Sequence, residues 1–241
     1  MILLLDRSTP PQKYVTRAGD AVTAAVLEDF FLFGGTVGDG FYVILTDSCE
    51  YAGLVELTEY RRAFVCTEKA DPQETSAFLS GCTDALAYPG AASHIGLAPK
   101  YRAWSFAGRT SGGGGADVVP VEPGNAREVT ELQQRAFGLT DEAARRRLEV
   151  LTSRLEMGRC RGFAAEENGR LVSCAVTDAE RDGNALIEGV CTDKEYRRRG
   201  FAKSCLWALT DSLLCGGISP TVFTGLNDNI AFYTRCGYVS F

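Results

Sequence analysis

The sequence has 241 residues, 45% of them apolar, so the chain is long enough to bury a sizeable core in one large domain or two ordinary ones. Its formal net charge is −6, with 9 basic and 13 acidic residues in positions 1–115 and 16 and 18 in positions 116–241. Neither half is basic, which argues against a nucleic-acid partner. The apolar run at the N-terminus is too short for a signal peptide and no later run approaches a membrane span, so we expect a cytoplasmic protein without membrane contact.

Cysteine and histidine usage limits the metal and disulfide chemistry of the chain. The nine cysteines are an odd number without CxxC spacing, and most lie inside apolar segments such as those around Cys174 and Cys205. We interpret them as reduced core thiols. His94 is the single histidine and stands outside any paired-ligand spacing, so we expect no metal and no histidine-dependent triad.

The first half of the chain gives a weak pattern. Apolar runs in "GFYVILTD", "YAGLVELTEY" and "RAFVCTE" predict strands, and "DPQETSAFLSGC" predicts a helix that opens on acidic residues. We interpret "LEDFFLFGG" as a further strand, with a helix as the alternative. The glycine string "GGTVGDG" lacks a strand-loop-helix frame and therefore does not predict a nucleotide-binding loop.

Four consecutive glycines in "TSGGGGAD" mark the clearest break in the chain. Glycine weakens backbone order, and a new β-prone run, "DVVPV", follows directly. We therefore predict an N-terminal α/β domain over residues 1–110, a linker over 111–116 and a second domain over 117–241. A long hairpin inside a single domain would have a similar composition.

Two helices follow the first strand of the second domain. "NAREVTELQQRAFG" is predicted to end at Gly138, and "LTDEAARRRLEVLTSRLEMG" to begin at a cap, Thr140 or Asp141, and to end before Gly158. Both show apolar side chains at helical spacing, which indicates one buried face each. These positions are Val129, Leu132 and Ala136 in the first helix and Ala144, Leu148, Leu151 and Leu155 in the second.

The remaining elements alternate between strands and helices. Asn-Gly and Asp-Gly pairs between apolar runs predict three antiparallel strands joined by hairpins. A helix over 201–215, a strand in "PTVFTGL", a short asparagine-capped helix in "NDNIAFYTRCG" and a terminal strand in "YVSF" complete the order β-α-α-β-β-β-α-β-α-β. This order predicts an α/β (α+β) fold with a mixed central sheet.

The segment "CTDKEYRRRGFAKSC" joins a predicted strand to the helix at residue 201. The first N–H groups of a helix lack partners and lie at the positive end of its dipole, so they bind anions such as a diphosphate. Gly200 would let a phosphate approach the backbone, and Ala202 keeps the same face small. A solvated, arginine-rich helix entrance accounts for the same residues, and spacing alone does not separate the two interpretations.

The motif "YRRRGFA" resembles the R/Q-x-x-G-x-G/A signature of the GNAT superfamily of acyl-CoA N-acyltransferases, with Arg197, Gly200 and Ala202 in the signature places. "ALIEGVCTDKEYR" resembles the fourth strand of that family, and "NDNIAFYTRCGY" its last helix. The resemblance covers residues 117–241. No such signature occurs in the first half, which we interpret as a degenerate copy of the same fold that supplies a wall of the acceptor pocket or the surface of a homodimer.

The resemblance implies a binding site for acetyl-CoA and no metal. The pantetheine arm would lie along Val190, Cys191 and Thr192, and Asn229 would lie near the thioester. The resemblance further implies a diphosphate site formed by the signature loop, in which Arg199 and Lys203 meet the adenosine 3′-phosphate or solvent. The residues of this loop are Arg197, Arg198, Arg199, Gly200, Phe201, Ala202 and Lys203.

The same resemblance implies direct transfer of an acetyl group to a primary amine of a small molecule or a protein. Tyr233 is the candidate acid that protonates the leaving thiolate, and a core tyrosine is the alternative. Glu188 lies two residues before Val190, so period-2 alternation places both on one face and makes Glu188 a candidate base, unless it pairs with an arginine or water alone takes the proton. The competing function is a non-catalytic acyl-CoA sensor or scaffold.

Overall fold

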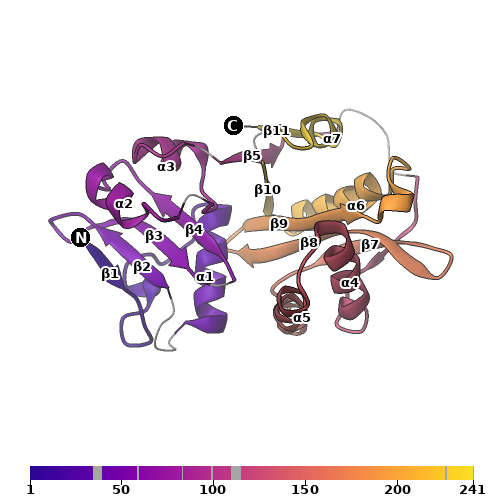
Figure 1. The fold of residues 1–241 in the computed structure, drawn as a ribbon, viewed down its shortest axis with the longest axis horizontal. Helices are drawn as coiled ribbons and strands as arrows, with labels where there is room; N and C mark the ends of the chain where they lie inside the picture. The colour runs from indigo at the N-terminus through magenta and orange to yellow at the C-terminus, as the bar shows by residue number, and fades with distance from the viewer. Residues whose placement is uncertain are drawn as a thin grey trace. The chain divides into compact units, whose positions relative to one another are not determined.

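The computed structural model describes residues 1–34, 40–58, 60–82, 84–98, 100–109, 115–225 and 227–240. The chain forms two compact units (Figure 1). The first contains Met1–Trp104, the short segment Phe223–Asp228 and Ser240 near the C-terminus, and the second contains Ser105–Val222 and Asn229–Val239. Most of the predicted linker, 111–114, and most of the glycine string in the first half, 35–39, lie outside the described residues.

The first unit is built on a four-stranded antiparallel sheet of order β1-β2-β3-β4. Helix α1 lies on one face of this sheet, and α2 and α3 lie on the other (Figure 1). The strands are β1 (Ile2–Leu4), β2 (Phe41–Leu45), β3 (Tyr51–Leu57) and β4 (Arg62–Cys66), and the helices are α1 (Ala21–Phe33), α2 (Pro72–Phe78), α3 (Pro89–His94) and a 3-10 helix (Pro11–Lys13). The predicted strands and the acid-opened helix of this half are confirmed.

The strand predicted for "LEDFFLFGG" is wrong, because residues 27–33 form the second half of α1. The side chain of Asp20 caps this helix and accepts hydrogen bonds from the N–H groups of Val22 and Thr23, each at 2.9 Å. Its first ten residues are all buried. A helix that is buried on all sides shows no 3.6-residue period, so periodicity could not separate it from a strand.

The second sheet has seven strands in the order β11-β5-β10-β9-β8-β7-β6. Strands β6 to β9 pair antiparallel with their neighbours, and β9 pairs parallel with β10, so the predicted mixed sheet is confirmed. The position of β5 in this sheet, between β10 and β11, was not predicted. The strands are β5 (Tyr101–Phe106), β6 (Val118–Pro120), β7 (Gly162–Glu167), β8 (Arg170–Arg181), β9 (Asn184–Thr192), β10 (Ser219–Gly225) and β11 (Tyr238–Ser240).

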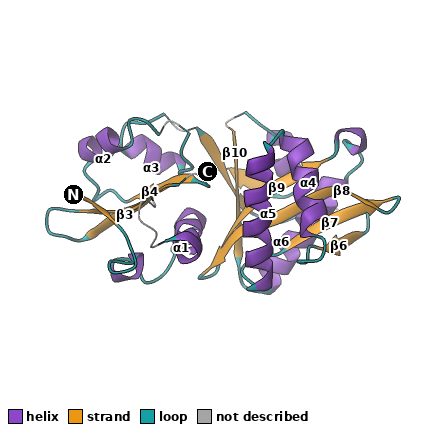
Figure 2. Cartoon of the chain, turned by 60° about the horizontal axis from the view of Figure 1, so that its bottom comes forward, coloured by secondary structure: helices purple, strands orange, loops and turns teal. Residues whose placement is uncertain are grey.

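Helices cover both faces of the sheet in the second unit. Figures 1 and 2 show α4 and α5 on one face of β7–β9 and α6 on the other. The predicted apolar positions of α4 and α5, except Ala144, pack into one core with Cys174 and Val176 of β8. The helices are α4 (Ala126–Phe137), α5 (Asp141–Glu156), α6 (Phe201–Cys215), α7 (Ile230–Arg235) and a 3-10 helix (Lys194–Tyr196).

Both predicted hairpin turns are present. Asn168 and Gly169 join β7 to β8 with φ of 55° and 73°, and Asp182 and Gly183 join β8 to β9 with φ of 51° and 81°. Left-handed conformation at both central residues is the geometry that Asn-Gly and Asp-Gly pairs favour, and its twist matches that of the strands. These turns position β9, which leads into the arginine-rich segment.

The helix ends follow the capping signals of the sequence. Thr140, rather than Asp141, caps α5, because its hydroxyl accepts the N–H of Ala143 at 3.2 Å. Gly138 ends α4 in the left-handed conformation, with φ of 68°. Among the described residues, no helix combines the length and the apolar character that a membrane span requires.

Candidate active site

The parallel ladder between β9 and β10 is short. It joins Asn184 to Ser219 and ends where Ile187 faces Val222. Strand β9 continues for five residues beyond that point, to Thr192. The backbone of Glu188–Thr192 therefore takes no part in the described ladder with β10. Its N–H and C=O groups on the side facing away from β8 are left for another extended chain.

A bulge at Gly189 interrupts β9 at the start of this segment. Cys191 faces Cys174 and Glu188 faces Val176, so three steps along β9 match two along β8. The period-2 argument that placed Glu188 on the face of Val190 is therefore wrong, because the bulge puts Glu188 on the face of Cys191. Gly189 has a φ of 65°.

The bulge brings two helical side chains against the backbone of β9. A Cβ atom at Gly189 would lie 2.3 Å from the Nε2 of Gln133 on α4 and 2.9 Å from the Nη2 of Arg147 on α5. A side chain at this position would displace the ends of these two side chains, and the positive φ adds strain for any other residue. The backbone conformation is therefore the main reason for glycine here.

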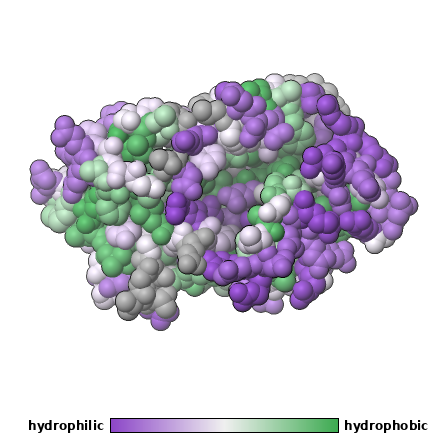
Figure 3. All heavy atoms as spheres, viewed as in Figure 1, coloured by the Kyte–Doolittle hydropathy of each residue, from purple (hydrophilic) through white to green (hydrophobic). Residues whose placement is uncertain are grey.

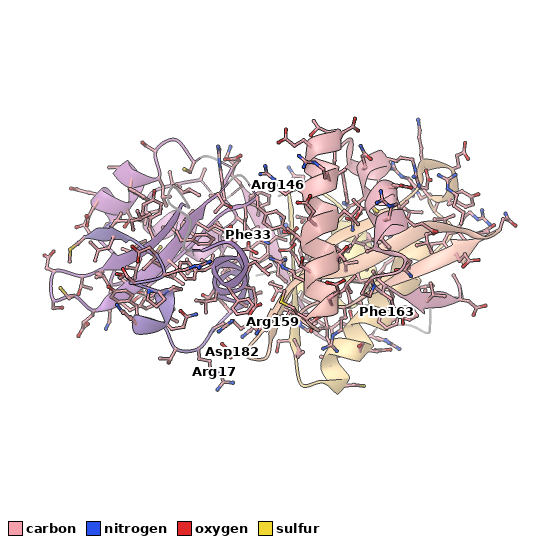
Figure 4. The ribbon with its side chains drawn as sticks, turned by 90° about the horizontal axis from the view of Figure 1, so that it is seen from below. Arg17, Phe33, Arg146, Arg159, Phe163 and Asp182 are labelled. Atoms are coloured by element: carbon pink, nitrogen blue, oxygen red, sulfur yellow. The ribbon has the colours of Figure 1, made fainter. Side chains whose placement is uncertain are left out.

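Glu188 belongs to a polar chain that reaches from β9 to both helices. Its Oε2 lies 3.8 Å from Nη1 of Arg147, so the predicted alternative of an arginine partner is present in the structure. The Nε of Arg147 donates to Oε1 of Gln133, and Nε2 of Gln133 donates to Sγ of Cys174 at 3.7 Å. Figure 4 shows α5 from the side, with Arg146 projecting from its first half and Arg159 following its end.

Gln133 and Arg147 were not identified from the sequence. Each carried a usable signal, because each is a polar residue within an apolar helical stripe. Gln133 lies four positions after Val129 and is completely buried, and Arg147 lies three positions after Ala144. Their convergence on Gly189 depends on the packing of two helices against one strand, which spacing along either helix does not show.

Cys191 points into the core rather than along the open side of β9. Its side chain is 7% exposed, and its Sγ lies 3.6 Å from that of Cys174. The hydrogen bond between the two thiols lowers the pKa of Cys174 and raises the pKa of Cys191. Any contact of Cys191 with pantetheine would therefore come from its backbone. Both thiols are free.

The arginine-rich segment turns into α6 without a side-chain cap. Gly200 is the N-cap residue, with φ of 90°, and Arg198 also has a positive φ, of 67°. A Cβ atom at Gly200 would meet no atom within 4 Å, so the space in front of the helix is open. The uncapped N–H groups of the first turn fit an anionic group such as a diphosphate.

The basic side chains around this opening already have protein contacts. The Nε of Arg197 donates to the carbonyl of Thr192 at 3.2 Å, and Nη2 of Arg199 lies 2.5 Å from Oε1 of Glu167. The ammonium of Lys203 lies 4.2 Å from the centre of the Trp207 ring. In the second unit, hydrophilic residues cover the end that carries the β7–β8 hairpin and the start of α6 (Figure 3).

Tyr233 and Asn229 lie at α7. The side chain of Tyr233 is 6% exposed and packs against Phe232 and Tyr238, with ring centres 5.0 and 6.1 Å away. Burial raises its pKa, so the phenol keeps its proton over the physiological range. Asn229 occupies the N-cap position in left-handed conformation, with φ of 54°, but the predicted cap bond from its side chain is not formed.

Together these features define an α/β domain in which five residues of β9 extend beyond the ladder with β10 and are followed by an uncapped helix N-terminus. The Acetyltransferase (GNAT) family matches residues 126–238 of the chain. No curated protein gives a significant match.

Solved structures share the fold. An acetyltransferase of the GNAT family from Colwellia psychrerythraea is 11% identical, with a TM-score of 0.61, over 100% of this chain and 96% of its own. A GNAT-family structure from Novosphingobium aromaticivorans is 16% identical, with a TM-score of 0.52, over 80% of this chain and 85% of its own. The chain contains a GNAT acetyltransferase domain in residues 126–238.

Proposed function

We propose that the chain transfers the acetyl group of acetyl-CoA to a primary amine of a small molecule or a protein. One observation carries this proposal. Helix α6 begins at Gly200 without a side-chain cap, and it follows the part of β9 that extends beyond the ladder with β10. One element fits a diphosphate and the other fits a pantetheine arm, and they are separated by a single loop.

Backbone groups would hold the cofactor. The N–H groups at Gly200, Phe201 and Ala202 would bind the diphosphate, and the backbone of Val190 and Thr192 would pair with pantetheine. Charge-assisted hydrogen bonds contribute about 1.5 to 3 kcal/mol each, whereas an exposed ion pair contributes about 0 to 1. The arginines of the loop would therefore assist rather than dominate. Bound acetyl-CoA supplies an acetyl group activated as a thioester.

Three groups of the chain would act on the reaction. The N–H of Val190 would donate to the oxygen that becomes negative, and the Tyr233 hydroxyl would donate to the departing sulfur. The raised pKa of Tyr233 keeps that proton in place beforehand. Glu188, whose Oε2 lies 3.8 Å from Nη1 of Arg147, would accept a proton from the amine, directly or through water.

A panel of primary amines, assayed for release of free CoA, tests the proposal together with a thermal-shift titration with acetyl-CoA. We expect stabilisation by acetyl-CoA and CoA release with at least one class of amine. Stabilisation without CoA release from any small amine or peptide would favour the acyl-CoA sensor instead. The absence of any thermal shift would remove acetyl-CoA as the ligand.

A further inference from the structure

Arg147 is a largely buried cation with unused hydrogen-bond donors. Its side chain is 18% exposed, and its Nε is taken by Gln133. Its Nη1 lies 3.8 Å from Oε2 of Glu188, which is beyond hydrogen-bond distance. Within the described residues, the two terminal nitrogens therefore make no hydrogen bond, so they are available to a ligand.

The guanidinium is held in place from two sides. Gln133 fixes its Nε from α4, and the bulge at Gly189 leaves space for its Nη2 against the backbone of β9. An arginine fixed through Nε presents the two terminal nitrogens as a fork, which matches the two oxygens of a carboxylate. The arrangement is one that binds an anion, and it is built from three separate elements.

The position of this fork assigns the anion to the acceptor. Gly189 directly precedes Val190, whose N–H would meet the thioester oxygen in the proposed function, so the fork lies beside the reacting end of the cofactor. The diphosphate would lie farther along the chain, beyond the end of β9, at Gly200. Glu188, next to the fork, offers a negative charge that suits the amine of the same acceptor.

We propose that Arg147 binds a carboxylate of the acceptor, so that the substrate is an amino acid or a similar amino-carboxylate. This inference rests on the proposed function of the same site. The pair of Arg147 and Glu188 then provides one charge for each end of a zwitterion, and Gln133 is the residue that positions the arginine. If Arg147 only neutralised Glu188, a carboxylate on the acceptor would not raise its kcat/KM above that of the matching carboxamide.

Matched acceptors test the inference through turnover. Each amino acid is compared with its own carboxamide, and CoA release gives kcat/KM for both. In the wild type we expect the free acid to be preferred by about tenfold or more, mainly through KM. Arg147→Gln should reduce the preference to near one, and Arg147→Lys should restore part of it. Equal rates for acid and amide in the wild type would overturn the inference.

Arg145→Gln is the matched control. Arg145 is on the same helix, is 70% exposed and lies 4.0 Å from Glu149, so the same change there alters a surface charge only. It should leave the preference for the acid unchanged. A loss of preference in both variants would mean that the net charge of the helix, rather than the fork at Arg147, selects the acceptor, and this would also overturn the inference.

A binding experiment separates this inference from the proposed function. N-acetyl amino acids and their amides are titrated into the CoA-bound chain by calorimetry, which needs no turnover. Tighter binding of the acids by about tenfold or more, lost in Arg147→Gln, supports the carboxylate site even if no amine is acetylated. Acetylation of amines without any preference for the acids would support the proposed function and reject the site.

Discussion

The first region of the chain (residues 1–110) and the second region (residues 117–241) repeat one order of strands and helices. They differ at the point where a strand leads into a helix. In the first, β2, β3 and β4 are antiparallel, α2 follows, and Ala63 then forms a parallel bridge with Leu86. In the second, β7, β8 and β9 are antiparallel, α6 follows, and β9 pairs parallel with β10 over four residues. A degenerate copy of the GNAT fold would show this order, and that origin of residues 1–110 stays a prediction.

The difference lies in the start of the helix. Helix α2 has 7 residues, and the carboxylate of Asp71 caps it by accepting the N–H of Glu74 at 2.7 Å. Helix α6 has 15 residues and begins at Gly200 without a side-chain cap. A carboxylate that occupies the first N–H groups repels a phosphate, whereas a glycine leaves the groups open. Of these two helix starts, the one at Gly200 is therefore the one that suits the proposed diphosphate site.

The largest expected effect is at Gly200. Gly200→Glu should weaken acetyl-CoA binding by about 100-fold or more, because in the proposed function a carboxylate would stand where the diphosphate binds. Calorimetry measures the change. The positive φ of 90° adds strain for any side chain, so Ala202→Glu, inside the helix, serves as an unstrained second variant.

Gln73→Glu is the matched change at the second residue of α2 and should leave acetyl-CoA binding unchanged. Normal binding by both variants of the second region would show that the loop at Gly200 does not hold the cofactor, and the contrast between the two helix starts would then have no functional meaning.

Tyr233→Phe should lower kcat by about 100-fold with little change in acetyl-CoA affinity, because a donor to the leaving group acts in the transition state. Since burial raises the pKa of Tyr233, ionisation of this residue should cause no fall in wild-type turnover as the pH rises to 10. Steady-state rates at saturating acetyl-CoA measure both effects. Tyr101→Phe is the control from the first region, and equal kcat in both variants would exclude Tyr233 as the acid.

The first region should respond to pH through stability instead of turnover. Glu56 is completely buried beside Asp29 and Arg61, and desolvation raises its pKa well above the ordinary value. The folded state then binds more protons than the unfolded state, so the free energy of unfolding should fall as the pH rises from 5 to 8.

Glu56→Gln should remove this slope and add about 1 to 3 kcal/mol to the free energy of unfolding at pH 8, because the neutral amide replaces a carboxylate that is disfavoured by burial. Urea unfolding at several pH values measures the effect. An unchanged slope in the variant would assign the pH dependence to other groups.

Arg199→Gln should have the smallest effect. Arg199 already lies against Glu167, and its guanidinium carbon lies 5.2 Å from the centre of the Phe201 ring, so the affinity for acetyl-CoA should fall by less than about fivefold. A titration at low and moderate salt checks this. A fall as large as that of Gly200→Glu would mean that side chains, and not backbone amides, hold the diphosphate.

Local signals explain why much of the second region was predicted correctly. The Asn168–Gly169 and Asp182–Gly183 turns, the cap at Thr140 and the glycine before α6 each act within a few residues of chain. Prediction failed for α1, where uniform burial removed the period, and for the face of Glu188, where the bulge at Gly189 broke the alternation.

The sequence by itself determined the order of elements in the second region, its turns and the uncapped start of α6, because these depend on backbone preferences of neighbouring residues. The tertiary structure alone decided that β5 joins the seven-stranded sheet and that Gln133 and Arg147, from two helices, meet at Gly189. Such contacts depend on strand register and on helix packing across many residues, and no local pattern encodes them.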